Sequence, residues 1–213
     1  MKLSDLFEEP YEVTDGVHSD NEIQKYGQMS SATLARDHEF LGSINSLQGE
    51  KIKLYALKSP QYAVIRGVIP GYTDHGLNTN FVVFALRFKS VIQAKLPKEL
   101  DGNKCLQVNS VFIAPEFRGE GITGAVYKLI ATKGFSIISD SAQFRDGKEL
   151  WKKLVRDVLD GEYKIYVLDD EYGFKKDTAG KPIEYDGSNI KDSEIWTSGD
   201  DFNGHHKLLV MKA

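Results

Sequence analysis

The order of local signals within residues 111–125, VFIAPEFRGEGITGA, decides how this chain folds. An apolar strand stops near Pro115, which cannot donate a hydrogen bond to a strand ladder. A short loop containing Arg118, Gly119 and Gly121 follows, and an amphipathic helix then begins. This order places the free backbone N–H groups of a helix N-terminus beside residues that allow close approach. The stretch therefore predicts a site for an anion, most naturally a phosphate-bearing ligand.

Each residue type in the loop suits that chemistry. Glycines 119, 121 and 124 carry no Cβ, so a ligand can approach their backbone closely. Arg118 can make a bidentate contact with a phosphate and keeps its charge at any physiological pH. Thr123 can either cap the helix or donate its hydroxyl to a phosphate oxygen. The aligned dipoles of the helix favour negative charge at the same place.

The helix after the loop is predicted to run from Thr123 to Lys133. Its apolar residues follow the i, i+3, i+4, i+7, i+8 spacing of one buried face. They are Ile122, Ala125, Val126, Leu129 and Ile130. Gly134 follows, as expected of a residue that ends a helix.

Two other phosphate-binding motifs also place glycines before a helix. A P-loop is excluded because no Gly-Lys-Ser/Thr follows the glycines. Gly119, Gly121 and Gly124 do match G-x-G-x-x-G, and Asp140 lies at about the 20-residue distance that a dinucleotide site requires. That motif belongs to a first strand–helix unit, whereas several strands precede residue 111, so the dinucleotide interpretation stays open as the weaker alternative.

The order strand-Pro-x-x-Arg-Gly-x-Gly resembles the acyl-CoA site of the GNAT (Gcn5-related N-acetyltransferase) superfamily. The motif of that superfamily is Arg/Gln-x-x-Gly-x-Gly/Ala, and residues 118–123 read RGEGIT here, with threonine at the last position. The resemblance implies that a CoA thioester, most simply acetyl-CoA, lies against the strand and the loop, and that no metal is needed. The residues implied to contact it are Val111, Ile113, Arg118, Gly119, Gly121, Ile122, Thr123 and Gly124. Backbone groups near Val111 to Ile113 would pair with the pantetheine amides, and Arg118 to Gly124 would hold the pyrophosphate.

The resemblance also implies a reaction. A neutral amine attacks the thioester carbonyl, while a general base takes a proton from the amine and a general acid protonates the thiolate. The superfamily often places the acid, a tyrosine, in a Leu-Tyr-x-x-Leu helix, but residues 150–154 read LWKKL, with Trp151 at that position. The candidates left for acid–base roles are Asp140, Tyr127 and His206. Asp140 could act as a base or bind the acceptor, or it could cap the turn that follows, and we favour the cap. Trp151 could form a platform for the substrate or anchor the core, and its place in an apolar stripe favours the core.

The rest of the chain follows the order typical of this superfamily. Four strands are predicted as an antiparallel meander, at 52–57, 62–69, 80–88 and 105–113, with a turn at Pro70-Gly71. The helix, a strand at 135–139, a helix from Asp146 or Gly147 and a strand at 163–168 follow. Short helices are expected near residues 3–7 and from Ser31 to Phe40, and a turn is expected at 186–189. Glu116 and Glu120, which flank the glycine loop, are expected to be solvated. We expect an α+β fold with a mixed, mainly antiparallel sheet flanked by helices. A single domain would comprise an irregular or helical part at 1–50, a core at 50–170, a polar loop or flap at 170–203 and a final strand from 204.

Composition narrows the classes of partner. The chain has 213 residues, 41% hydrophobic and 27% charged, so a packed core is expected. A net charge of −4 argues against a broad nucleic-acid surface. The single cysteine, Cys105, cannot form an internal disulfide, and its apolar strand indicates a core position. No segment is apolar and long enough for a membrane span or a signal peptide, so the cytoplasm is the expected compartment.

The leading hypothesis is thus an acetyl-CoA-dependent N-acyltransferase whose acceptor is an amine on a small molecule, a peptide or a protein. Residues 139–151 and the later pair Ile195-Trp196 also resemble segments of GNAT-like bacteriophage proteins. A phage source would place the protein in the host cytoplasm. The alternative is a GNAT-fold binding or structural protein without transferase activity, acting on a host or virion partner. Trp151 at the tyrosine position and the polar segment before the last strand motivate it.

Overall fold

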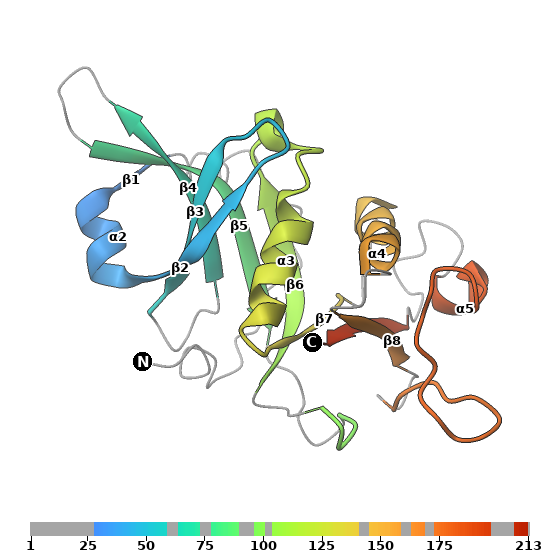
Figure 1. Cartoon of the computed structure of the whole chain (residues 1–213). Helices are drawn as coiled ribbons and strands as arrows, with labels where there is room; N and C mark the ends of the chain where they lie inside the picture. The colour runs from blue at the N-terminus through green and yellow to red at the C-terminus, as the bar shows by residue number, and fades with distance from the viewer. Residues whose placement is uncertain are drawn as a thin grey trace. The chain divides into compact units, whose positions relative to one another are not determined.

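The structure is a computed structural model of the 213-residue chain. It describes residues 28–58, 64–72, 78–89, 96–100, 104–140, 145–158, 163–168, 173–196 and 207–212. The chain divides into two compact units, the first holding residues 1–90 and 109–126 and the second residues 91–108 and 127–213. Figure 1 traces the chain through both units from the N-terminus in blue to the C-terminus in red.

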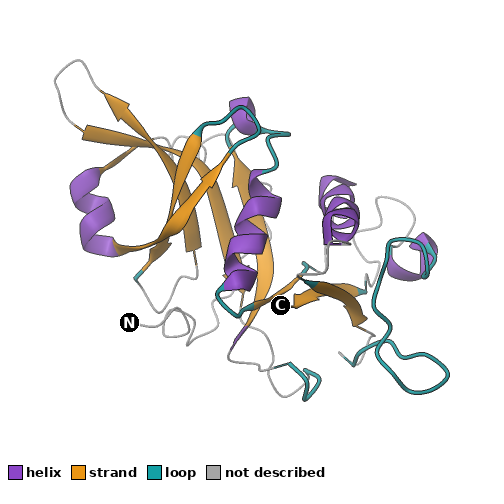
Figure 2. Ribbon diagram, viewed as in Figure 1, coloured by secondary structure: helices purple, strands orange, loops and turns teal. Residues whose placement is uncertain are grey.

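The first unit is built on an antiparallel meander, seen as the orange strands beside the short purple helix α2 in Figure 2. Its strands are β2 His38–Asn45, β3 Lys51–Leu57, β4 Val64–Tyr72 and β5 Asn78–Lys89. β3 alternates buried and less buried residues, with Ile52, Leu54 and Ala56 turned into the core. This period-two pattern is the reason that the segment forms a strand with one buried face. The short β1, Gln28–Ser30, pairs with β5.

β6, Cys105–Ile113, begins in the second unit and ends in the first. It leads through the 3₁₀ turn Pro115–Phe117 into helix α3, Ile122–Thr132. Gly134 ends the helix with φ +83°, and the N–H of Phe135 donates to the carbonyl of Ile130. A left-handed glycine with such a bond is the usual way to stop a helix.

The second unit alternates strands and helices. It contains β7 Ser136–Ile138, α4 Arg145–Val158, β8 Lys164–Leu168 and β9 Leu208–Lys212, with the strand order β6-β7-β9-β8. Of the strand pairs with a described register, only β6 with β7 is parallel. One core cluster of this unit joins all four strands and part of the polar segment. Its buried members are Leu100, Cys105, Ile138, Leu168, Phe174, Leu208 and Val210.

The polar segment before the last strand carries more buried contacts than its composition predicts. Isolated bridges pair Lys176 with Pro182 and Leu168 with Phe174, which gives the described part of the segment the character of a small β-flap. A short helix, α5 Asp192–Ile195, follows. The aromatic residues Phe174, Tyr185 and Trp196 are all at most 5% exposed, so they anchor the segment to its unit.

The predicted mixed α+β class with a mainly antiparallel sheet is confirmed, and the strands and helices predicted from residue 52 onward lie within a few residues of their predicted bounds. β1 and β2, however, lie in the part that was predicted to be irregular or helical. Two further local predictions are wrong. Pro70 and Gly71 were expected to form a turn, but both lie inside β4, paired with Asn80 and Thr79. A helix expected to run to Phe40 ends at Asp37, where β2 begins. The helix predicted near residues 3–7 lies outside the described residues.

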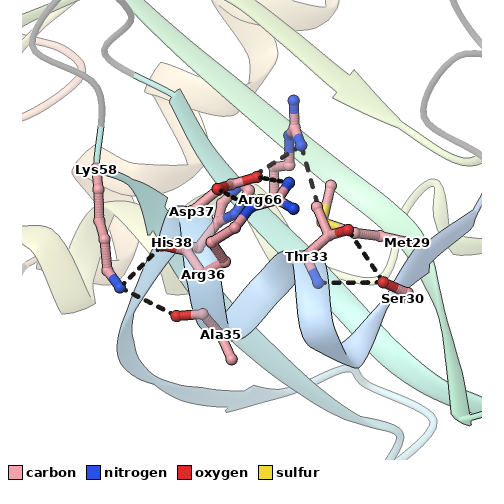
Figure 3. Close-up of polar contacts among 9 residues, drawn as sticks. All are labelled: Met29, Ser30, Thr33, Ala35, Arg36, Asp37, His38, Lys58 and Arg66. Atoms are coloured by element: carbon pink, nitrogen blue, oxygen red, sulfur yellow. Dashed lines mark hydrogen bonds and ion pairs between the residues drawn. The ribbon is translucent and has the colours of Figure 1, made fainter.

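A polar cluster holds α2, Ser31–Asp37, against the meander (Figure 3). The Arg66 Nη1 lies 3.3 Å from Nε2 of His38 and 3.8 Å from the sulfur of Met29. Because a guanidinium has no acceptor, His38 must accept through Nε2, and its neutral ring then carries the proton on Nδ1. At the other end of α2, Lys58 Nζ donates to the carbonyl oxygens of Ala35 and Arg36, where a cation is favoured.

This cluster makes stability depend on pH. Burial, and then the charge of Arg66, lower the pKa of His38, and the smaller opposing effects of the Thr33 backbone and Asp37 do not reverse the shift. Lys58 also disfavours the charged ring. The unfolded chain therefore binds a proton more readily than the folded one, so the stabilising effect is present above the unfolded pKa of about 6.5 and is lost as the pH falls below it.

We expect the free energy of unfolding to fall between about pH 7 and pH 5, and His38→Gln to flatten that slope. Glutamine keeps an acceptor for Arg66 but does not titrate. Denaturant titrations of both proteins at several pH values measure the difference in slope. Equal slopes for the two proteins would show that His38 does not carry the effect.

Candidate functional site

The glycine loop starts from a fixed exit out of β6. The N–H of Ala114 donates to the carbonyl of Val83 on β5 at 2.9 Å, which ties the end of β6 to the meander. Phe117 then donates to Ala114, and Arg118 to Pro115, closing the 3₁₀ turn. The loop therefore leaves the sheet in a defined direction.

Two glycines give the loop its shape. Gly119 and Gly121 have φ values of +82° and +72°, in the left-handed region that side-chain-bearing residues rarely adopt. A Cβ added at Gly119 would meet nothing within 4 Å, and one at Gly121 would meet only Leu47 Cγ, at 3.9 Å. The space above both glycines is therefore open in the described structure, as a ligand cradle requires.

Helix α3 presents unpaired amides at the end of the loop. The N–H of Ala125 donates to the carbonyl of Gly121 at 3.1 Å, and this is the first hydrogen bond of the helix. The amides of Ile122, Thr123 and Gly124 come before it and so have no partner within the helix. Ile122 and Thr123 bury their side chains, which fixes the orientation of these amides. The helix end thus favours an anion by geometry and by its dipole.

The C-terminal part of β6 has little support from β7. The parallel register covers only Cys105 to Gln107, opposite Ser136 to Ile138, and β7 then ends. β6 runs on to Ile113, and its residues change from buried to half-buried beyond Val108. The segment predicted to pair with pantetheine, 111–113, lies beyond the described register of β6 with β7.

Arg118 is exposed beside this segment. Its Nε donates to the carbonyl of Ile113 at 3.4 Å, so the guanidinium lies over the strand–loop junction. The structure thus brings all the predicted cofactor-binding residues, 111 to 124, onto one strand end, one loop and one helix end of the first unit.

Glu120, expected to be solvated, has partners instead. Its carboxylate accepts from the backbone N–H of Gln48 at 3.0 Å and from the Gln48 side-chain amide at 2.7 Å. Its carbonyl accepts from the N–H of Leu47 at 3.3 Å. These bonds hold the carboxylate on the turn between β2 and β3. No sequence pattern marks this contact, because Gln48 and Glu120 lie 72 residues apart and both look like ordinary polar loop residues.

The predicted acid–base residues lie in different surroundings. Tyr127 is 1% exposed and packs against Trp151, with 5.9 Å between ring centroids. Burial, and then the charge of Asp140, raise the pKa of Tyr127, which disfavours proton donation. Asp140 is half-buried just after β7, and His206 lies outside the described residues. No acid–base role follows from these positions, and the three assignments stay predictions.

Three further predictions concern Trp151, Cys105 and the turn at Asp186. Trp151 is 3% exposed, which confirms it as a core residue, and Cys105 is buried as a free thiol, as predicted. Asp186 accepts from the amides of Ser188 and Asn189, which confirms the predicted turn there. Among the residues that the structure describes, no group of three or more metal-ligating side chains comes together.

Comparisons with family models, with curated proteins and with solved structures found no match to this chain. None of the helices in the described ranges is both long and apolar enough to cross a membrane.

Proposed function

We propose that the protein binds a CoA thioester at the glycine loop and transfers its acyl group, most simply acetyl, to an amine. The observation that carries the proposal is the loop itself, with two left-handed glycines under open space and the free amides of α3 beside them. A pyrophosphate offers acceptor oxygens to several such amides at once. Arg118 adds a permanent positive charge at the strand–loop junction.

The end of β6 supports the pantetheine half of the ligand. Strand β6 is extended up to Ile113 and leads directly into the loop, so a ligand held at the loop would have its extended chain of amides alongside the end of this strand. The thioester would then lie farther back along β6, away from the loop. Direct attack by a neutral amine there needs orientation and proton transfer from side chains or water, and no metal.

Calorimetric titration with acetyl-CoA and with CoA tests the proposal. We expect a dissociation constant between about 1 µM and 1 mM, the range of typical enzyme–substrate affinities. NADH serves as the matched probe for the dinucleotide interpretation, since it also carries a pyrophosphate between two larger groups. No heat of binding with either CoA ligand at millimolar concentration would overturn the proposal, and tight binding of NADH alone would favour the alternative motif.

A second function is favoured by one observation, the burial of Tyr127 against Trp151. With a tryptophan at the usual tyrosine position and the nearby tyrosine buried, the protein would bind a CoA ligand or a macromolecular partner without turnover. Release of free CoA from acetyl-CoA, followed with a thiol reagent across a panel of amines and lysine peptides, separates the two functions. Amine-dependent turnover would exclude the inactive form.

A further inference from the structure

Strand β8 is the last strand in the described strand order, yet its outer edge is covered by the polar segment that follows it in the chain. The backbone amides of Lys175 and Tyr185 donate to carbonyl groups of β8, at 2.8 and 2.7 Å. Isolated bridges join Phe174 and Glu184 to the same strand. The residues on either side of 176–182 therefore pair with β8 as one interrupted strand, and this strand forms the edge of the sheet in the second unit.

The interruption, residues 176–182, disfavours pairing with a further strand. The N–H of Ile183 donates to the carbonyl of Lys175 at 2.8 Å, which closes the loop at its base and occupies that carbonyl. Inside the loop, the Asp177 carboxylate accepts from two backbone amides, each at 2.9 Å. Pro182 has no N–H to donate, and the loop also carries two exposed lysines. Lysine, proline and extra residues are features by which proteins keep the edge of a sheet from pairing.

The side chain of Asn189 occupies the outer edge beyond the loop. Its Nδ2 donates to the carbonyl of Glu184 at 2.7 Å, and its Oδ1 accepts from the N–H of Asp186 at 3.3 Å. Because the N–H of Tyr185 points toward β8, the backbone groups of its two neighbours point the other way. A strand added to this edge would donate to that carbonyl and accept from that N–H, and the Asn189 amide does both.

The turn that carries Asn189 is itself fixed. The Asp186 carboxylate accepts from the amides of Ser188 and Asn189, at 2.7 and 2.8 Å. Tyr185 and Ile190, on the two sides of the turn, are 2% and 4% exposed, so both ends are anchored in the second unit. The turn therefore holds the exposed asparagine amide against the edge.

We infer that the loop 176–182 and the Asn189 amide close this edge of the sheet against a second copy of the chain. A second copy is the partner to be excluded, because two identical edge strands can pair antiparallel about a two-fold axis. The same contacts form on both sides of such an axis, so each opened edge would supply a partner for the other. This role is independent of acyl transfer and of any ligand at the glycine loop.

Two changes together should open the edge. Deletion of 176–182 joins Lys175 to Ile183, which their hydrogen bond already holds close together. Asn189→Ala frees the two backbone groups that the amide occupies. The protein with both changes should associate as its concentration rises, approaching about twice the mass of the unchanged protein in sedimentation equilibrium. Each single change should produce weaker association, because the other part of the covering remains.

Glu184→Pro, added to the double variant, is the matched control. The N–H of Glu184 points away from β8, so proline removes a donor from the outer edge alone and should return the protein to its unchanged mass. If the double variant kept the mass of the unchanged protein at every concentration, the inference would be overturned. Association that survives Glu184→Pro would overturn it too, because another surface would then be responsible.

Hydrogen exchange tests the edge in a variant that should fold normally. Asn189→Ala alone truncates one exposed side chain, and thermal melts check that its fold is kept. The amide of Asp186 should exchange faster in this variant than in the unchanged protein, because it loses the Asn189 oxygen. An equal rate in the two proteins would show that the asparagine does not cover the edge.

Discussion

Replacing Gly121 with glutamate should weaken binding of CoA and acetyl-CoA by at least about a hundredfold. Gly121 lies at the start of α3 with φ +72°, and the space above it is open except for Leu47. A glutamate side chain would occupy that space and bring a negative charge to the place proposed for the pyrophosphate. Like charges about 4 Å apart near a protein surface repel by roughly 4 kcal/mol, enough to account for the loss.

The control for this substitution is Gly180→Glu. Gly180 has nearly the same backbone conformation, φ +79°, and an added Cβ there would meet nothing within 4 Å, but it lies in the turn that begins at Asp177 in the second unit. Both variants should lose about 1–2 kcal/mol of stability from the left-handed backbone, which thermal melts would show. Only Gly121→Glu should lose affinity in calorimetry. Equal affinity in the two variants would show that the ligand does not bind at this loop.

Replacing Trp151 with alanine should lower the free energy of unfolding by about 3–5 kcal/mol, the usual cost of removing a large aromatic side chain from a core. Trp151 is 3% exposed on α4 and contacts the ring of Tyr127, which is itself 1% exposed. Removing the indole leaves a cavity and uncovers part of that tyrosine. Urea titration measures the loss as a shift of the midpoint with little change in slope.

Trp151→Phe is the informative companion. It keeps an aromatic ring against Tyr127 and should retain more stability than the alanine variant. If the alanine variant were as stable as the unchanged protein, Trp151 would not be a core anchor, and a role at a ligand surface would have to be considered. If Trp151 acts only through packing, the phenylalanine variant should also bind CoA with unchanged affinity.

Strand β6, helix α3 and the glycine loop between them could be predicted from the sequence. The β6 strand has the predicted bounds 105–113, because a mostly apolar run ends just before a proline. The bounds of helix α3 differ by only one residue from the predicted ones. The prediction succeeded because the apolar residues have clear helical spacing and a glycine lies at each end of the helix. The residues of the loop lie together because they are neighbours in the chain. These are local signals, and local signals are the ones that a sequence carries clearly.

The features that the sequence did not predict are contacts between residues that lie far apart in the chain. The Pro70-Gly71 pair predicts a turn because proline usually breaks strands, yet Pro70 pairs in register with Asn80 on β5. The bonds from Gln48 to Glu120 join positions 72 residues apart, and no periodicity marks either of them. The burial of Tyr127 by Trp151 likewise joins two helices. Tertiary packing decides such contacts, and one sequence carries no direct signal of it.

The turn between β2 and β3 also restricts how this chain can change in length. Surface turns between two strands normally accept inserted residues with little effect. This turn is fixed at its tip by three hydrogen bonds to Glu120, so an added residue would move Leu47 and Gln48 out of reach of the loop. The hairpin must therefore keep its length for the cradle to keep its shape, although it lies more than 60 residues upstream of the glycines.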